Sequence, residues 1–392
     1  MNRPLIITIG IVVILFVLGL WVYLLLFGTP NNSGEVFSNL GFKLSPQEVT
    51  ITPPVADVPL PETTVDTTGE ALRQLTTRPV AGFIFINTAS SSMVRYAERG
   101  TGYIYEIDLT TGKEESLSRT TIPQVAEAVF SPSGDTVALT SYNQYVTSVF
   151  VGTLGEEINL EGIQLQPGAE NISFASDEDV LYTVGSNGTT KGYRHNITTQ
   201  SRSEVFSFNY SNIDVGWGSN LDDIYIATKP SQNLEGYIYK TENNTLTPIT
   251  PPARGLSALY SNNNIITTFV QSDKYKSVSQ SSNGARNPLP ILALKEKCDF
   301  DVFAKDYVWC AAPATITNAD FAEDWYKGIT TSNDLLWLVN IPEGEAQLYA
   351  NFQDLSGRII DVSEIAINSD GTALSFTNKL DHTLWLYALT AE

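Results

Sequence analysis

Beyond residue 70, short apolar runs alternate with turns rich in Ser, Asp, Asn and Gly. Two such runs, Thr136–Thr140 and Val146–Val151, alternate in the way that is typical of half-buried β-strands. The turn before them, Ser131–Asp135, has the Pro, Ser, Gly and Asp that tight turns favour. This pattern predicts an all-β domain.

The unit of strand, turn and strand recurs at a nearly constant interval. The residues that end its first strand are Ile86, Phe130, Phe174, Trp217, Tyr260, Phe303 and Ile367. Successive members of this series are 43 or 44 residues apart, and the last two are 64 apart. A period of about 40–45 residues made of strands is typical of four-stranded propeller blades. Seven repeats predict a seven-bladed β-propeller over residues 70–392.

The last repeat has only two further strands, at Ala373–Phe376 and Thr383–Leu389. Its sheet would therefore end in an uncovered edge, which proteins avoid. The segment Ala71–Thr76 precedes the first repeat and takes the place that outer strands hold before later repeats. We predict that residues 71–76 close the ring on the last blade.

Residues Pro4–Phe27 carry no charged side chain. At about 1.5 Å per residue, such a helix is longer than a ~30 Å hydrocarbon core. We predict a transmembrane signal-anchor helix over residues 1–28, followed by a Pro/Thr-rich linker over residues 29–69. A cleaved signal peptide is the alternative, although Leu26-Phe27-Gly28 has no small-x-small cleavage pattern.

Charge orients this span and excludes one class of partner. Arg3 precedes the span and no basic residue follows it until Lys43, so the positive-inside rule places the N-terminus in the cytoplasm. The propeller is then expected outside the cell membrane, on a single-pass anchor. Acidic residues number 43 against 23 Lys and Arg, for a net charge of −20, which would repel a nucleic acid. We expect no nucleic-acid partner.

The turns Phe130-Ser131-Pro132-Ser133-Gly134-Asp135 and Asn368-Ser369-Asp370-Gly371 resemble the S-P-D-G turn of WD40-like, TolB-type (PD40) propeller repeats. The resemblance covers residues 70–392 and implies a propeller fold. The tract Val94-Arg95-Tyr96 with Gly102–Glu106 is similar to a feature of membrane-anchored bacterial propellers. The chain departs from TolB itself in its seven predicted blades and its predicted anchor, so the partners of TolB are not carried over.

The 64-residue interval indicates an insertion at residues 313–333. It contains Trp325, Tyr326 and Lys327, and aromatic residues on long loops are frequent binding anchors. We expect these residues to bind a partner. The alternative is that Trp325 and Tyr326 fold back as a plug over the mouth of the central channel.

Cations recur in the connections between blades, which share a face of the ring with the insertion. They are Arg78, Arg119, Arg254, Lys295 with Lys297, and Arg358. In an acidic protein they would form a locally positive mouth for an anionic group or an acidic partner. The alternative is that they are ordinary solvated loop charges.

The two cysteines, Cys298 and Cys310, fall on expected adjacent strands of the sixth blade. A hairpin centred near Ala304 places them opposite each other, which predicts a disulfide. Two buried thiols are the alternative. With two Cys and two His in the chain, we expect no metal site and no cofactor.

The sequence favours a non-catalytic platform that binds a protein or a cell-envelope polymer on its loop face. The segment Gly255–Leu259 lacks the closing Gly of a hydrolase nucleophile elbow. The alternative is an extracytoplasmic glycan-active hydrolase that uses channel carboxylates such as Glu127, Asp214 and Glu364. Two converging carboxylates with a raised pKa would distinguish it.

Overall fold

The structure of the protein is a computed structural model, and its described residues belong to one compact unit. The described residues are 71–389, without 88–91, 143–145, 156, 219–223, 243–244, 262–263, 282 and 316–319. The predicted transmembrane helix at 1–28 and the linker at 29–69 lie outside them. Within the described part of the chain, no helix is long and apolar enough to cross a membrane.

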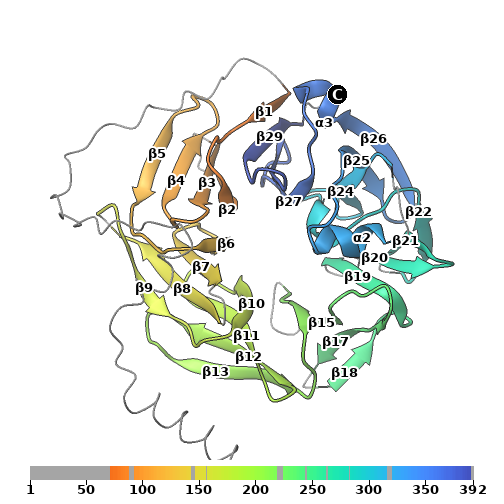
Figure 1. Ribbon diagram of the computed structural model, residues 1–392, viewed down its shortest axis with the longest axis horizontal. Helices are drawn as coiled ribbons and strands as arrows, with labels where there is room; N and C mark the ends of the chain where they lie inside the picture. The colour runs from red at the N-terminus through yellow and green to blue at the C-terminus, as the bar shows by residue number, and fades with distance from the viewer. Residues whose placement is uncertain are drawn as a thin grey trace, which may run out of the picture. The chain divides into compact units, whose positions relative to one another are not determined.

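Seven antiparallel sheets follow one another around a ring in the described part of the chain (Figure 1), and most strands pair with their neighbours in sequence. The prediction of an all-β, seven-bladed propeller is therefore confirmed. Blades 1 to 3 contain β2 (Val80–Asn87), β3 (Ser92–Glu98), β4 (Ile104–Asp108), β5 (Glu114–Ser118); β6 (Val125–Phe130), β7 (Thr136–Tyr142), β8 (Thr147–Leu154), β9 (Leu160–Gln164); and β10 (Ala169–Phe174), β11 (Asp179–Ser186), β12 (Thr189–Asn196), β13 (Arg202–Phe208).

The remaining blades follow the same order, with one addition. Blades 4 to 6 contain β14 (Ile213–Gly216), β15 (Ile224–Thr228), β17 (Ile238–Glu242), β18 (Thr245–Pro248); β19 (Ala253–Ser261), β20 (Asn264–Gln271), β21 (Lys274–Gln280), β22 (Arg286–Leu289); and β23 (Cys298–Phe300), β24 (Tyr307–Pro313), β25 (Asp334–Asn340), β26 (Glu345–Asn351). The addition is β16 (Glu235–Gly236), which pairs with the inner strand of blade 5. Blade 5 is thus a five-stranded sheet.

Blade 7 combines both ends of the described chain. It contains β27 (Val362–Ile367), β28 (Ala373–Asn378), β29 (Leu384–Ala388) and β1 (Leu72–Gln74). β1 pairs antiparallel with β29, with Leu72 opposite Tyr387 and Gln74 opposite Trp385. The first described strand is therefore the outer strand of the last blade.

Apolar side chains on facing sheets hold neighbouring blades together. One cluster joins Val94 and Tyr96 of blade 1 to Leu384 and Leu386 of blade 7. The inner strands also approach closely: a Cβ on Gly82 of β2 would lie 2.0 Å from the carbonyl oxygen of Ala128 on β6. Only glycine fits at that approach.

Five inner strands contain a register shift, namely β2, β6, β10, β19 and β27. A bulge of this kind redirects the side chains that follow it. Gly82, Glu127 and Glu364 hold the same place after the bulge in blades 1, 2 and 7. Their strands are neighbours in the ring, and the glycine lies between the two glutamates.

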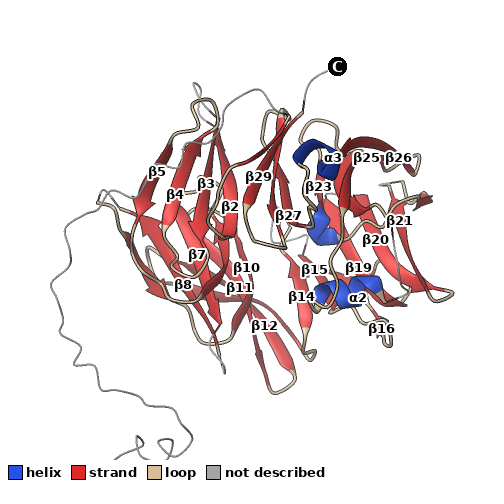
Figure 2. Cartoon of the chain, turned by 45° about the horizontal axis from the view of Figure 1, so that its top comes forward, coloured by secondary structure: helices blue, strands red, loops and turns tan. Residues whose placement is uncertain are grey.

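Among the described residues, three short helical segments lie outside the sheets (Figure 2). They are the 3-10 helix η2 (Lys295–Lys297), α2 (Phe321–Tyr326) and α3 (Phe352–Ser356). The sequence predicted only a loop at residues 313–333. Instead α2 forms there, because Phe321, Ala322 and Trp325 share one face of the helix and are all buried.

Candidate functional site

We call one side of the ring the connection face. It carries the connection from the second to the third strand of each blade and the connection from each outer strand to the next inner strand. The insertion with α2 and the cation-bearing connections all lie there. Each predicted site residue can therefore be compared on this one surface.

Trp325 is 3% exposed and packs against Leu292, Leu294 and Phe321. Its indole N–H donates to Asp361 Oδ1 at 2.8 Å. Trp325 is therefore not presented to a partner, contrary to the expectation. A buried indole is stable when its N–H has a hydrogen-bond acceptor, and Asp361 is that acceptor here. Trp325 is folded back into the protein, in line with the alternative, whereas a plug over the channel mouth stays a prediction.

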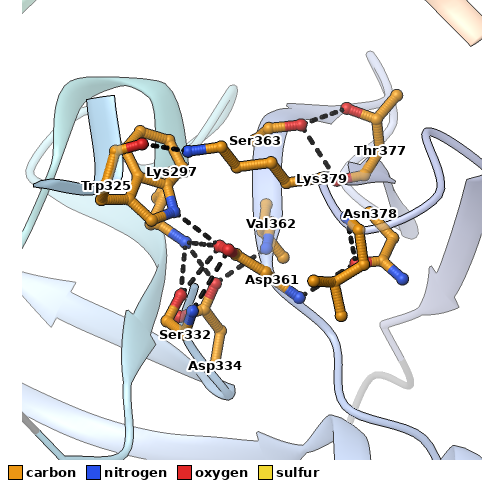
Figure 3. Close-up of polar contacts among 11 residues, drawn as sticks. Lys297, Trp325, Ser332, Asp334, Asp361, Val362, Ser363, Thr377, Asn378 and Lys379 are labelled. Carbon is orange, nitrogen blue, oxygen red and sulfur yellow. Dashed lines mark hydrogen bonds and ion pairs between the residues drawn. The ribbon is translucent and has the colours of Figure 1, made fainter. Parts of the chain in front are cut away.

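A buried ionic network lies between blades 6 and 7 and holds Trp325 of α2 (Figure 3). Lys297 Nζ contacts Asp334 Oδ2 at 2.5 Å and Asp361 Oδ1 at 2.7 Å, and all three side chains are fully buried. Ser332 donates to Asp361 Oδ1 at 2.8 Å. Lys379 donates to the Trp325 carbonyl, and its ammonium lies 3.6 Å from the centre of the indole ring. Two cations and two carboxylates thus neutralise each other around one tryptophan.

Burial shifts the pKa of Asp334 and the pKa of Lys379 in the directions that disfavour charge. Burial raises the pKa of Asp334, although Lys297 opposes that change. Burial lowers the pKa of Lys379, partly opposed by Asp361. Removing one partner would leave a buried charge uncompensated, which is strongly destabilising. The network is therefore a structural support for the connection face.

Tyr326 and Lys327 lie at the end of α2 and are more accessible. Tyr326 is 36% exposed, and its hydroxyl donates to Glu296 Oε2 at 2.8 Å. Lys327 pairs with Glu323 at 2.6 Å, one helical turn earlier. Both residues are available at the surface, but each already has a partner within the chain.

The connection cations do not form a positive mouth. Arg78 pairs with Glu114 at 2.9 Å, and Arg254 pairs with Asp273 at the same distance. Arg358 pairs with Asp381 at 2.8 Å. Lys297 is buried in the network described above, Lys295 pairs with Asp214 at 2.9 Å, and Arg119 also has an interaction partner. A carboxylate therefore lies beside Arg78, Arg254, Arg358, Lys295 and Lys297, and the structure does not have the positive mouth that the sequence predicted.

The connection face instead exposes apolar side chains. Fourteen described large hydrophobic residues are exposed, and ten of them lie on this face: Tyr142, Val146, Tyr210, Leu234, Tyr237, Tyr326, Ile329, Leu355, Ile359 and Leu380. Leu234 and Ile329 are each 69% exposed. Ile329 follows α2, and its backbone N–H donates to the Asp324 carbonyl at 2.8 Å. The connection that carries Leu234 is tied to α2 as well, because the backbone N–H of Gln232 donates to Glu323 Oε2 at 2.7 Å. The sequence does not predict these residues, because single apolar residues in loops carry no periodic signal.

Pockets open along the wall of the channel. One of about 260 Å³ lies between blades 4 and 5 and is lined by Asp214, Tyr225, Tyr260 and Lys295. A second of about 440 Å³ reaches back to blade 2 and is lined by Glu127, Glu170 and Lys229. Asn171 and Asp214 line both. The predicted channel residues Glu127 and Asp214 therefore both line the second pocket, and Asp214 also lines the first.

Glu364 and Glu127 approach each other across Gly82. Burial, and next the charge of Glu127, raises the pKa of Glu364 to about 8. Glu127 Oε1 accepts a hydrogen bond from the Tyr142 hydroxyl at 2.9 Å. Among the described residues, no group of three or more His, Cys, Asp or Glu side chains has the arrangement of a metal site.

Cys298 and Cys310 lie directly opposite each other on β23 and β24 and are joined by a disulfide. Both are buried, at 5% and 0% exposure. The bond ties the inner strand of blade 6 to its neighbour. It lies beside the core of the blade and outside the pockets described above, so its part is structural.

No protein-family model and no curated protein matches this sequence. Solved structures share its fold. An oligogalacturonate lyase in complex with manganese is 12% identical, with a TM-score of 0.56 over 84% of this chain and 96% of its own. The oligogalacturonate lyase of Vibrio parahaemolyticus is 9% identical, with a TM-score of 0.56 over 84% and 96%.

WD40 propellers are similar to a comparable degree. The Cps50 (Swd1) β-propeller domain of Myceliophteria thermophila is 9% identical, with a TM-score of 0.53 over 81% of this chain and 100% of its own. The WD40 repeats of RRP9 are 9% identical, with a TM-score of 0.51 over 82% and 98%. The resemblance to WD40-like repeats is thus confirmed as a fold. Since the same fold serves a lyase and WD40 repeats, function has to be argued from the site.

Proposed function

We propose that this chain is a non-catalytic binding propeller, held on the outer side of a membrane by its N-terminal segment. Its connection face binds another protein. The observation that carries the proposal is that ten of the fourteen exposed large hydrophobic residues in the described part of the chain lie on that face. A bias of exposed apolar and aromatic side chains toward one face favours a protein-binding role for it.

The face is also well prepared for binding. The buried network of Lys297, Asp334 and Asp361 fixes α2, and α2 fixes the connection that carries Leu234. A surface that is already ordered loses little side-chain and loop entropy on association. Ion pairing of the connection cations leaves apolar contact as the main attraction that this face offers.

Crosslinking in the native membrane, read by mass spectrometry, tests the proposal. We compare the wild-type chain with the double variant Leu234→Ser/Ile329→Ser. The matched control is Phe303→Ser, which changes a side chain of 71% exposure in the hairpin between β23 and β24, on the opposite face. A partner captured by wild type and control, but lost from the double variant, supports the proposal. Equal capture by all three forms, or by none, contradicts it.

One observation favours a second function, a glycan-active hydrolase. The carboxyl of Glu364 has its pKa raised to about 8 beside Glu127, and a protonated carboxylic acid near a carboxylate is the pair that glycoside hydrolysis uses. Release of reducing sugar from envelope polysaccharide by wild type, but not by Glu364→Gln, would establish this activity. Its absence leaves the binding role.

A further inference from the structure

One lysine and two aspartates meet in the interior of the protein, between blades 6 and 7 (Figure 3). The Nζ atom of Lys297 lies 2.5 Å from Asp334 Oδ2 and 2.7 Å from Asp361 Oδ1. All three side chains are fully buried. A primary amine is thus held against a carboxyl group away from bulk water, which is the arrangement that amide formation requires.

Burial favours the uncharged forms of this amine and this acid. It raises the pKa of Asp334, an effect that Lys297 opposes and the charge of Asp361 reinforces. Transfer of a proton from the Lys297 ammonium to the Asp334 carboxylate leaves a neutral pair, which costs less to bury than two ions do. A desolvated neutral lysine is a nucleophile toward carbonyl carbon. The site therefore holds both reactants of a condensation.

The two carboxyl oxygens of Asp334 are held differently. Oδ2 contacts Lys297 Nζ and accepts the backbone N–H of Val362 at 2.8 Å. Oδ1 is buried and has no hydrogen-bond partner among the described residues. Departure of Oδ1 would therefore break no hydrogen bond of the fold. The Val362 N–H would stay on the remaining oxygen and stabilise the negative charge that it takes up during attack.

Asp361 is positioned to carry a proton between the two reactants. Its Oδ1 atom accepts hydrogen bonds from the Trp325 indole N–H and the Ser332 hydroxyl, both at 2.8 Å. Its Oδ2 atom accepts the Ser332 backbone N–H at 3.1 Å. These donors fix the carboxylate beside Lys297 Nζ, where it can act as a general base. The indole ring, 4.5 Å from Nζ, shields that side from water.

We propose that Lys297 and Asp334 condense to an intramolecular isopeptide bond after the chain has folded. One proton passes from the Lys297 ammonium to the Asp334 carboxyl group, and the free amine attacks Cγ of Asp334. As the C–N bond forms, Asp361 takes a second proton from Nζ and passes it to the departing Oδ1. The C–Oδ1 bond breaks and one water leaves. The products are an amide and a water, and Asp361 returns to its starting state.

The bond would close a covalent loop around most of blade 6. Lys297 ends η2 and Asp334 begins β25, 37 positions later. The loop contains β23, β24 and the insertion with α2. A reductant would open the disulfide within this loop and leave the amide intact. The inference concerns the folded chain itself, so it stands whether or not the connection face binds a partner.

Mass spectrometry of the denatured, reduced and trypsin-digested full chain tests the proposal. Trypsin should not cut after Lys297, because acylation removes the charge of a lysine. We expect residues 296–305 joined to residues 328–358, lighter than the two separate peptides by the mass of one water. The surface pair Lys113–Glu115 is an internal control, since it has the same 2.5 Å distance but side chains that are 71% and 59% exposed. We expect no amide there.

Two variants separate condensation from mere proximity. Lys297→Met should contain no joined peptide. Asp361→Asn keeps the shape of the side chain but cannot take a proton, so it should condense about 100-fold more slowly, as the joined fraction over time measures; circular dichroism shows whether it folds. Free Lys297 throughout the wild type would overturn the proposal, whatever the variants do. So would a joined peptide in Lys297→Met, or an unchanged rate in folded Asp361→Asn.

Discussion

Thr76 and Leu384 exchange hydrogen bonds although 308 residues separate them in the chain. The backbone N–H of Leu384 donates to Thr76 Oγ1 at 3.0 Å, and the N–H of Thr76 donates to the Leu384 carbonyl at 3.3 Å. Leu75 donates to the same carbonyl at 2.8 Å. These bonds join the beginning of the described chain to its last blade and close the ring.

Removal of this closing segment should open blade 7. We expect a chain that starts at residue 77 to melt roughly 10 °C below one that starts at residue 70, because Leu72 and Leu75 are 3% and 2% exposed and burial of each contributes about 1.5–3 kcal/mol. The shorter chain should also self-associate through the exposed edge of β29. Calorimetry and size-exclusion chromatography measure the two effects. Equal melting temperatures would show that β1 does not close the ring.

The insertion supplies a second prediction. Trp325→Ala should lower the melting temperature by roughly 10 °C, since deleting a buried aromatic ring costs about 3–5 kcal/mol. The matched control is Lys327→Ala, two residues later, where the side chain is 54% exposed and makes only a surface ion pair. We expect that control to melt within about 2 °C of wild type. A Trp325→Ala chain as stable as the control would return Trp325 to the role of a surface anchor.

The number of blades could be predicted from the sequence because each blade repeats the same alternation at the same spacing. The opposition of Cys298 and Cys310 followed from hairpin symmetry alone. The burial of Trp325 could not be predicted, because it depends on Asp361, which lies 36 positions away in another blade. Glu127 and Glu364 show what a repeat alignment can find. They hold equivalent positions after a bulge, and Gly82 occupies that position in the blade between them.

The disulfide leads to a third prediction. Replacing both Cys298 and Cys310 with Ala should lower the free energy of unfolding by about 2–4 kcal/mol, because the unfolded chain regains the freedom of a closed loop. Urea denaturation of the two forms measures the difference. A reductant should lower the free energy of unfolding of the wild type by the same amount. It should leave the free energy of unfolding of the double-Ala chain unchanged. A wild type insensitive to reductant would indicate that the bond does not contribute to stability.

Glu364 gives the chain a defined pH dependence. Its pKa is raised from an ordinary 4.5 to about 8 by burial and by Glu127, so the folded state keeps a proton that the unfolded state has released. The protonated carboxyl of Glu364 therefore contributes to the free energy of unfolding. This contribution is fully present below pH 4.5 and is lost as the pH rises to about 8. Burial also raises the pKa of Asp299 to about 6, and it lowers the pKa of His195 and His382 below 6.5. Between pH 6.5 and 8, Glu364 should therefore dominate.

The decisive comparison is Glu364→Gln, which keeps the shape of the side chain and cannot ionise. We expect the wild type to lose up to a few kcal/mol of stability between pH 6.5 and 8, and the Gln variant to lose much less. Glu345→Gln, on the exposed outer strand of blade 6, should behave as wild type does. Urea denaturation at half-unit pH steps measures all three slopes. A Gln variant as pH-dependent as wild type would mean that Glu364 is already ionised in the channel, which would also remove the acid that the hydrolase alternative requires.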